Sequence, residues 1–322
     1  MSNDSLVSII IVNYNGKELL KKCLSSLSYT QYPNYEIIVV DNGSSDGSST
    51  FVQEKYPNVL LVQLDRNHGF AKSNNMGAKK ARGEYLVFLN NDTEVTPEWL
   101  VELVKVTRQD TKTAICQSLL LKNDSVDSSG DFVDDLGRAY SDKNYKDDVV
   151  PILGARGAAM LAKKDIFWEL GGFDEKFFVS FEDIDIGWRA WLWGYKVYVA
   201  PKSIVYHRGR GTISKFEAEI AFHAVKNSIL LRLVNFEGMM AIRSVVIVSF
   251  VIFMRKIFGT AIVKDPEIAP PLPSFGTILR AMCWIIANHS YVCSKKKLVN
   301  SRRIMTTKDL MEKDLITKFS FR

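Results

Sequence analysis

The sequence has 322 residues, of which 47% are hydrophobic and 24% charged, as in a globular protein with a substantial core. This composition excludes an intrinsically disordered chain and leaves room for one large or two ordinary domains. The net charge of +6 is uneven: residues 1–200 hold 22 Lys and Arg against 28 Asp and Glu, whereas residues 201–322 hold 20 against 8. A basic end on a mildly acidic body predicts attachment to a polyanion, either nucleic acid or an anionic membrane surface.

The first half of the chain alternates short β-branched runs with helical patterns. We expect strands at residues 7–12, 35–40, 59–64 and 84–89, and the helices between them include one near residues 18–27 and one near residues 71–81. Such apolar strands separated by helices predict an α/β fold with a mostly parallel sheet flanked by helices. Each strand ends in a polar turn, and ligands of these sheets bind at the carboxyl ends of the strands. No GxGxxG or GxxxxGK[ST] motif is present, so we expect no glycine-rich phosphate loop.

Residues 110–150 are rich in Asp, Ser and Asn, and we interpret them as a long surface loop with room for a hairpin, its acidity serving solvation. The block "FFVSFEDIDIGWRAWLWGY" (177–195) follows and predicts a helix. It carries Glu182, Asp183 and Asp185 among apolar residues. These acids are either ordinary helix-start residues, with a capping box from Ser180 to Asp183, or groups whose mutual repulsion is tolerated for a function.

The four cysteines form no CxxC pair and no Cys/His cluster at zinc-ligand spacing, so we expect neither a zinc site nor a disulfide framework. The N-terminus lacks a basic segment and its apolar run is short for a signal peptide, which predicts an uncleaved cytosolic start.

The last third predicts apolar helices with basic flanks. Ser214 and Glu217 form a capping box before a long helix. Between Arg243 and Arg255 there are 11 residues, roughly 16 Å of helix against a bilayer core of about 30 Å, so this segment cannot span a membrane. A proline-rich linker and a second apolar segment follow. Apolar helices bordered by Lys and Arg predict attachment to an anionic membrane surface, and the alternative is a helical hairpin packed on the body.

Five motifs occur together along the chain: "VSIIIVNYNG", "IIVVDNGSSDGS", "NHGFAKSNNMGAKKARGEYLVFLNNDTEV", "GGFDEKFFVSFEDIDIGWR" and "VYHRG". Their order and spacing resemble those of family 2 glycosyltransferases with the GT-A fold, and most closely the rhamnosyltransferase-like branch that builds cell-surface polysaccharides. The resemblance covers about residues 5–235. It implies a nucleotide-sugar-binding catalytic domain over residues 1–235, followed by a helical, basic and membrane-associating region over residues 236–322.

The resemblance implies that Asp41 accepts the imide N–H of uracil or thymine, and the alternative is an Asx turn, which is how we interpret Asp46. Arg156 is a further candidate for a phosphate contact. The other nucleotide- or donor-binding positions that the resemblance implies are Asn13, Asn75, Asn91 and Gly157.

A divalent metal, Mg²⁺ or Mn²⁺, is implied where "NND" replaces the family's D-x-D motif. Only one carboxylate remains there, Asp92, and His207 matches a histidine that binds the metal in relatives. The alternatives are a helix start at Thr96 and Pro97, and a structural histidine.

Asp183 matches the general base of the family. Glu182 and Asp185 would orient it and pair with cations such as Arg189, and the aromatic surroundings would raise its pKa. The implied reaction is direct displacement with inversion at the anomeric carbon.

The function implied by the resemblance is transfer of one or a few sugars, rhamnose as the family-level expectation, from a dTDP- or UDP-activated donor to a hydroxyl of a glycan or polyprenyl-linked acceptor. The Q-x-x-R-W motif of processive synthases is absent. We expect a cytoplasmic enzyme that is peripheral on the inner face of the cell membrane. The alternative is an inactive nucleotide-sugar-binding subunit that anchors a polysaccharide assembly complex. The basic tail matches no nucleic-acid motif, so we expect no nucleic-acid partner.

Overall fold

The computed structural model describes residues 4–209, 217–258 and 273–319. Its strands are β1 (Val7–Asn13), β2 (Tyr35–Asp41), β3 (Leu60–Gln63), β4 (Tyr85–Asn90), β5 (Thr93–Val95), β6 (Thr113–Lys122), β7 (Ser125–Ser128), β8 (Asp131–Asp134), β9 (Ala139–Ser141), β10 (Val150–Pro151), β11 (Ala159–Lys163), β12 (Lys196–His207) and β13 (Ile316–Thr317). Its helices are α1 (Lys17–Leu27), α2 (Ser48–Lys55), α3 (Gly69–Lys80), α4 (Trp99–Arg108), α5 (Lys164–Glu169), α6 (Glu182–Leu192), α7 (Glu217–Asn235), α8 (Gly238–Phe258), α9 (Phe275–Ala287), α10 (His289–Ser301) and α11 (Thr307–Glu312).

One large sheet forms the centre of the fold, with strand order β10-β12-β6-β11-β4-β1-β2-β3. The neighbours β4, β1, β2 and β3 are parallel, as are β12 and β6, whereas β11 runs antiparallel between β4 and β6. The four strands predicted in the first half are present within one or two residues of the expected bounds. The predicted α/β fold with a mostly parallel sheet is confirmed.

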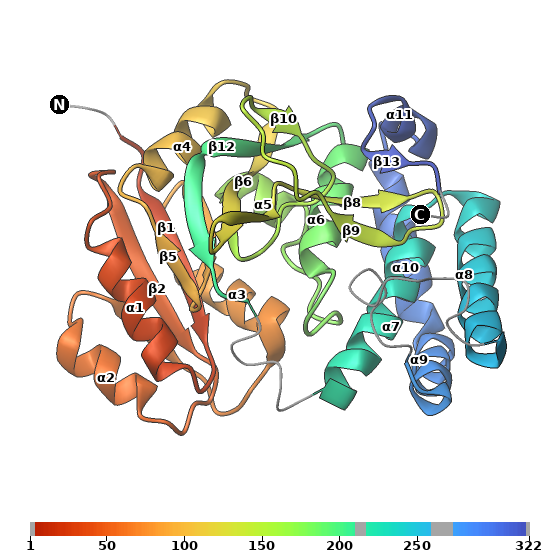
Figure 1. Cartoon of the computed structure of the whole chain (residues 1–322), viewed down its shortest axis with the longest axis horizontal. Coiled ribbons are helices and arrows are strands. Elements are labelled where there is room, and N and C mark those ends of the chain that lie inside the picture. Colours follow the sequence, from red (N-terminus) through yellow and green to blue (C-terminus); the bar gives the residue numbers. More distant parts are fainter. Residues whose placement is uncertain (1–3, 210–216, 259–272, 320–322) are drawn as a thin grey trace.

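The two faces of the sheet bury different side chains because successive residues of a strand point to opposite sides. In β1, Ile10 packs with α3, α5 and α6, whereas Ile9 and Ile11 pack with α1 and α4. Figure 1 shows these helices on either side of the strands. The near-continuous apolar strands seen in the sequence are therefore explained by burial on both faces.

The interpretation of residues 110–150 as a surface loop is wrong in its first part. Residues 113–122 form β6, which lies between β12 and β11 and is buried from Thr113 to Leu120. The acidic residues after it form β7 and a small second sheet in which β8 and β9 pair as an antiparallel hairpin. Several of these acids pair with arginines instead of facing water, which is why composition alone mistook the segment for a solvated loop.

The C-terminal helices pack on the α/β body of the chain. Helix α7 contacts α8, α9 and α10, and these helices lie together at the end of the molecule opposite α1 and α2 (Figure 1). Val292, Val299 and Leu310 are buried in the same core cluster as α6, and β13 extends the small sheet by pairing with β8. This is the packing that the hairpin alternative describes. The division at residue 235 stays a prediction, and Ser214 of the predicted capping box lies outside the described residues.

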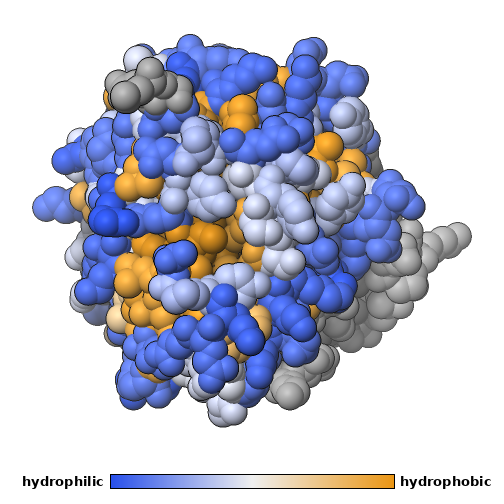
Figure 2. Space-filling view, turned by 90° about the vertical axis from the view of Figure 1, so that its left-hand side faces the viewer, coloured by the Kyte–Doolittle hydropathy of each residue, from blue (hydrophilic) through white to orange (hydrophobic). Residues whose placement is uncertain are grey.

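Across the described residues, every helix falls short of the length and apolar character that crossing a bilayer requires. The face of the molecule on the side of α1 and α2 is mostly hydrophilic, with hydrophobic side chains gathered near its centre (Figure 2). At the opposite end, α8 up to residue 249 and α9 expose large apolar side chains that include Met239, Ile242, Val246, Phe275, Leu279 and Ile286.

Candidate active site

The ends of three parallel strands bring the first group of predicted residues together. In the β1–β2 register Asn13 lies beside Asp41, and in the β1–β4 register Val12 lies beside Asn90. The Asn91 side chain, in the turn after β4, donates from Nδ2 to Oδ1 of Asn13 at 2.7 Å, in a buried position. The sequence places all these groups at one edge of the sheet, where the carboxyl ends of parallel strands coincide.

Asp41 is only 5% exposed at the end of β2. Its Oδ2 accepts a hydrogen bond from the Ser49 hydroxyl, and its Oδ1 accepts one from the Ser44 N–H at 3.3 Å. The second bond ties Asp41 to the backbone three residues on, so this oxygen serves the turn after β2, although not in the two-residue spacing of an Asx turn. Asp46 accepts from the backbone N–H groups of Lys17 at 2.9 Å and Ser48 at 3.1 Å, in line with its interpretation as a turn residue.

Asp92 and His207 face each other because β5 pairs antiparallel with the end of β12. The register aligns Thr93 with His207, which places the preceding Asp92 next to the imidazole. His207 Nε2 lies 3.5 Å from Oδ1 of Asp92, and both side chains are almost buried. The helix-start alternative for this segment is wrong, because α4 begins only at Trp99 and the Thr96 hydroxyl donates to the carbonyl of Ile204.

The other nitrogen of His207 is held by a residue that the sequence analysis missed. His207 Nδ1 lies 2.8 Å from Oδ2 of Asp127, in the segment first taken for a solvated loop. Burial alone would lower the pKa of the His207 imidazole, but hydrogen bonds to Asp127 and Asp92 and their negative charges raise it to about 9. Without a bound metal the imidazole is therefore protonated at neutral pH, with Asp127 and Asp92 as its two acceptors.

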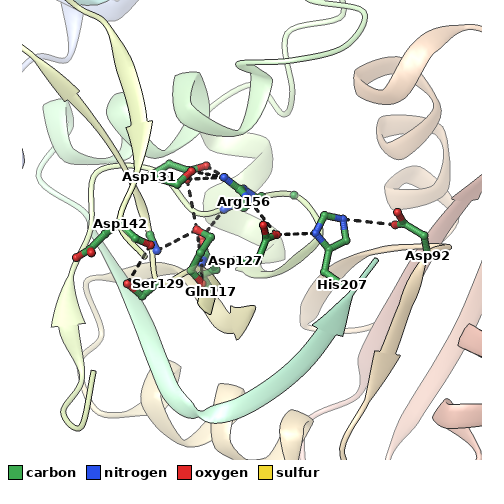
Figure 3. A network of polar contacts seen from close by, with 12 residues as sticks. Asp92, Gln117, Asp127, Ser129, Asp131, Asp142, Arg156 and His207 are labelled. Atoms are coloured by element: carbon green, nitrogen blue, oxygen red, sulfur yellow. Dashed lines mark hydrogen bonds and ion pairs between the residues drawn. The ribbon is translucent and has the colours of Figure 1, made fainter. Parts of the chain in front are cut away.

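Arg156 extends this pair into a network that Figure 3 shows as a chain from Asp92 through His207, Asp127 and Arg156 to Asp131. Arg156 Nη1 lies 3.1 Å from Asp127 and Nη2 lies 3.1 Å from Asp131. Its own N–H donates to Oε1 of Gln117 on β6 at 2.6 Å. Arg156 was a candidate for a phosphate contact, but its guanidinium is engaged by carboxylates of the protein.

Asp183 lies at the start of α6 and is half-buried. Its Oδ2 accepts a hydrogen bond from the N–H of Gly157 at 3.0 Å. Burial and the negative charge of Asp131 raise the pKa of the Asp183 carboxyl, against the opposing effect of Arg156 and of the hydrogen bonds from Gly157 and Ile184. The predicted rise in pKa has the expected direction. The capping-box alternative is wrong, since Phe181 is the N-cap and no side chain caps the helix.

The predicted supporting residues of Asp183 have a different arrangement. Asp185 and Arg189 form a buried ion pair at 2.8 Å, and Arg189 also donates to the carbonyls of Leu170 and Gly172. The expected pairing of Asp185 with Arg189 is therefore present, but the hydrogen bonds found on Asp183 come from backbone N–H groups. This pair fixes α6 to the turn after α5 and does not bind Asp183.

Glu182 is 4% exposed, and its Oε2 has no hydrogen-bond partner in the part of the chain that the structure describes. Burial, followed by the charge of Asp183, raises the pKa of Glu182 well above its ordinary value. A buried carboxyl in these surroundings favours the protonated form.

Both polar groups of the Asn75 side chain bind the protein backbone. Its Nδ2 donates to the Phe173 carbonyl at 2.8 Å, and its Oδ1 accepts from the Phe173 N–H at 3.1 Å. Both polar atoms thus join α3 to the turn after α5, which gives Asn75 a structural role. Gly157 has no room for a side chain, because a Cβ there would lie 2.9 Å from the ring of Phe70.

The residues fit a divalent metal through two ligands. One carboxylate and one imidazole nitrogen face a common point, and a metal-binding histidine commonly gives its second N–H to a carboxylate, as His207 does with Asp127. Among the described residues no group of three His, Cys, Asp or Glu side chains could hold an ion. Mg²⁺ often binds to one or two carboxylates and completes its coordination with substrate phosphates and water.

Comparison with known proteins gives the same family as the motifs. The sequence profile of glycosyl transferase family 2 matches residues 8–171, half of the chain. The O-antigen biosynthesis protein RfbC of Myxococcus xanthus is 32% identical over 218 residues, covering 62% of this chain and 17% of that protein. An N-acetylglucosaminyl-diphospho-decaprenol L-rhamnosyltransferase of Mycobacterium tuberculosis is 24% identical over 257 residues, covering 70% of this chain and 84% of that enzyme.

Among solved structures, GalNAc-T7 with UDP, GalNAc and Mn²⁺ is similar with a TM-score of 0.61 at 17% identity, covering 90% of this chain and 58% of that one. The mannosyltransferase PcManGT of Pyrobaculum calidifontis with GDP-Man and Mn²⁺ has a TM-score of 0.54 at 18% identity, covering 93% and 75%. At identities this low, the similarity shows a shared fold and nothing about the ligands of this chain. The chain spans 17% of the Myxococcus protein and 61% of the hexosyltransferase Agl10 of Haloferax volcanii. From the profile match and the shared GT-A fold, we conclude that the chain belongs to glycosyl transferase family 2.

Proposed function

We propose that this protein is an inverting glycosyltransferase that moves a sugar from a nucleotide diphosphate to an acceptor hydroxyl in the synthesis of a surface polysaccharide. The main support for the proposal is one short segment that contacts both the proposed metal site and the proposed base. Arg156 binds Asp127, the partner of His207, and the adjacent Gly157 N–H binds Asp183. The leaving-group side and the base side are therefore positioned by neighbouring residues.

The donor is proposed to be a uridine or thymidine diphosphate sugar. Asp41 lies at a strand end as an acceptor suited to a pyrimidine imide N–H, and Asn13 and Asn91 lie on the neighbouring strand end and turn. UDP is bound in the structures of GalNAc-T7 and of S. aureus TarS, while PcManGT holds GDP-Man. Rhamnose as the sugar is supported by the name of the Mycobacterium relative, and so is a polyprenyl-linked acceptor.

In the proposed reaction Asp183 takes the proton of the acceptor hydroxyl while that oxygen attacks the anomeric carbon from the face opposite the diphosphate. The bond to the diphosphate breaks in the same step, so the configuration inverts. A raised pKa makes the ionised Asp183 a stronger base, as general base catalysis requires. Asp92 and His207 would hold Mg²⁺ or Mn²⁺, which when bound neutralises charge on the departing diphosphate.

The test is the shift in melting temperature with UDP, dTDP and GDP, each with and without Mn²⁺, for the wild type and for Asp92→Ala. A ligand that binds only the native state stabilises it by RT ln(1 + [L]/Kd). We expect a Mn²⁺-dependent shift for UDP or dTDP that Asp92→Ala removes, together with turnover of a matching donor. Nucleotide binding without turnover would favour the inactive subunit, an alternative motivated by the single carboxylate in "NND". No shift with any pyrimidine nucleotide would contradict both.

The enzyme is further proposed to work at the cytoplasmic surface of the membrane, through the outward face of α9. Phe275, Leu279, Met282 and Ile286 follow one another at helical spacing and are 43–69% exposed. Exposed basic residues follow later in the chain, Lys297 on α10 and Arg302 just beyond it, of which Arg302 also pairs with Glu169 at 3.1 Å. An apolar helix face followed by basic residues matches the chemistry of an anionic lipid surface, where both contribute to binding.

Flotation with liposomes tests this surface. The double variant Leu279→Glu/Ile286→Glu should lose binding to vesicles with anionic phosphatidylglycerol, whereas Leu60→Glu, on the exposed edge strand β3, should keep it. Binding that survives the double variant, or binding equally strong to neutral phosphatidylcholine vesicles, would contradict the proposal.

A further inference from the structure

The segment that leads into α6 has an unusual backbone. Phe178, Ser180 and Phe181 have φ angles of 65°, 72° and 72°, the left-handed region that side chains other than glycine rarely adopt. Such conformations persist only where the surrounding structure imposes them, and they concentrate at functional sites. Asp183 follows two residues later, so the direction of its carboxylate depends on how this segment, residues 176–181, is held.

One side chain of α7 holds most of it. The Asn227 Nδ2 atom lies 2.8, 2.8 and 2.7 Å from the carbonyl oxygens of Phe177, Val179 and Ser180, and one of its two N–H groups is shared between two of them. The asparagine is fully buried, and its Oδ1 has no partner among the described residues. Turning the amide over would set an oxygen against three carbonyl oxygens, so the carbonyls themselves fix its orientation.

Other groups bind the remaining carbonyls. The Lys226 ammonium donates to the carbonyl of Lys176, and the N–H groups of Phe70 and Ala71, at the start of α3, lie 2.6 and 3.2 Å from the carbonyl of Phe178. The ring of Phe178 stacks on His223 of α7 with ring centres 4.7 Å apart. All five carbonyls from residue 176 to residue 180 are thus bound by groups of α7 or α3. Within the segment itself, the Val179 N–H also donates to the Phe177 carbonyl at 2.8 Å.

We propose that Asn227 is a positioning residue for the base: it holds the strained backbone of residues 176–181 so that the Asp183 carboxylate is aimed at the acceptor hydroxyl. The inference rests on the proposed function, in which Asp183 is the base. A displacement of about 1 Å at such a group can cost about 100-fold in rate. Within the described parts of the chain, the hydrogen bonds of the Asn227 side chain go to this segment and not to the donor side, so nucleotide binding should not depend on it.

The test compares Asn227→Ala with Val234→Ala, which removes buried methyl groups from the same helix nearly two turns away. We expect kcat of Asn227→Ala to fall about 100-fold, while KM for the donor and the affinity for UDP and Mn²⁺ change by less than about threefold. Asn227→Ser, which keeps one hydroxyl donor, should have an intermediate kcat. The acid limb of the pH profile should move to lower pH, because a loosened Asp183 becomes better hydrated and its pKa falls.

Hydrogen exchange gives a readout that does not depend on turnover. The amides of residues 178–184 should exchange faster in Asn227→Ala than in Val234→Ala. A kcat for Asn227→Ala equal to that of Val234→Ala would overturn the inference while leaving the proposed function intact, and so would a loss confined to KM. If the wild type binds UDP but transfers no sugar, the base assignment fails and the inference fails with it. If Asn227→Ala does not fold, the ratio of kcat between Asn227→Ser and Val234→Ala decides in the same way.

Discussion

The donor side of the site and the base side are built differently. At the donor side, Asn13 and Asp41 end two adjacent parallel strands, and the strand register alone sets their spacing. Asp183, the proposed base, follows a strained segment held by α7 and α3, and His207, the proposed metal ligand, is oriented by Asp127, 80 residues earlier in the chain. The nucleotide-binding strand ends are thus positioned by backbone hydrogen bonds in the sheet, whereas the base and the metal ligand are positioned by side chains from distant elements.

The difference has a consequence for substitutions. A strand register cannot shift by one residue without turning every side chain of the strand to the other face, so a single change at a strand end acts locally. A side-chain network has no such protection, because removing one member leaves its buried partners unsatisfied. Substitutions at the nucleotide-binding strand ends should therefore change nucleotide affinity alone. Those around Asp183 should change rates and stability, and those around His207 should change metal binding.

The largest effect should come from Asp183→Asn. The amide cannot take the acceptor proton but keeps an oxygen for the Gly157 N–H, so kcat should fall about 10²–10⁴-fold with little change in UDP affinity. In the wild type, activity should fall as the pH is lowered through the raised pKa of Asp183, hence at a higher pH than the usual value near 4 for an aspartate. Initial-rate kinetics between pH 4 and 8 measure both. If Asp183→Asn kept the wild-type kcat, Asp183 would not be the general base.

A smaller effect is expected at Asp127, which joins the two sides. Asp127→Asn keeps the shape but removes the charge that orients the His207 imidazole, and loss of such a partner typically lowers metal affinity about 10–100-fold. Calorimetric titration of Mn²⁺ in the presence of UDP measures it. Asp142→Asn is the control. It removes one negative charge from the same acidic segment, but the Asp142 carboxylate pairs with Lys146 and not with His207. Equal affinities in the two variants would show that Asp127 does not support the metal site.

At the donor side we expect a local effect on nucleotide preference. Asp41→Ala removes an acceptor for the imide N–H and should weaken UDP binding about tenfold, with a smaller change for GDP. Asp46→Ala should loosen the turn near α1 and α2 without changing the ratio of the two affinities, because its oxygens bind backbone N–H groups of Lys17 and Ser48. Fluorescence titration with both nucleotides separates the two variants. An unchanged ratio in Asp41→Ala would refute base recognition there.

The smallest effect concerns the stability of the base side. The pKa of Glu182 is raised in the folded protein by burial, so folding loses stability as the pH rises from the unfolded pKa through the folded one. Glu182→Gln should therefore raise the melting temperature at pH 7, about 2–4 °C for each kcal/mol, and the gain should vanish at pH 4, where Glu182 is protonated. Glu312→Gln, an exposed control, should change neither. A lower melting temperature for Glu182→Gln at pH 7 would contradict this account.

The same contrast explains what the sequence could predict. The strands that carry Asn13 and Asp41 were visible because each is a continuous apolar run ending in a polar turn. The partner of His207 was not visible, because Asp127 lies in an acidic stretch whose composition equally suits a solvated loop. Asn227 gave no signal either, since nothing in a helical pattern shows that an amide about 50 residues away will bind the carbonyls of residues 177, 179 and 180. Motifs report chemistry that is local in the chain, and these contacts are not local.

The pairing of β13 with β8 limits which variants can test membrane attachment. Ile316 lies beside Val133, and Leu310, Leu315 and Ile316 are buried in the core. A shortened chain, the usual means of separating a tail from an enzyme, would here remove one strand of the small sheet and open the core beneath it. Loss of both lipid binding and activity in such a chain would say nothing about either. The last residues of the described chain stabilise the β8–β9 hairpin. Only substitutions on the outward surface of α9 can therefore separate membrane attachment from folding.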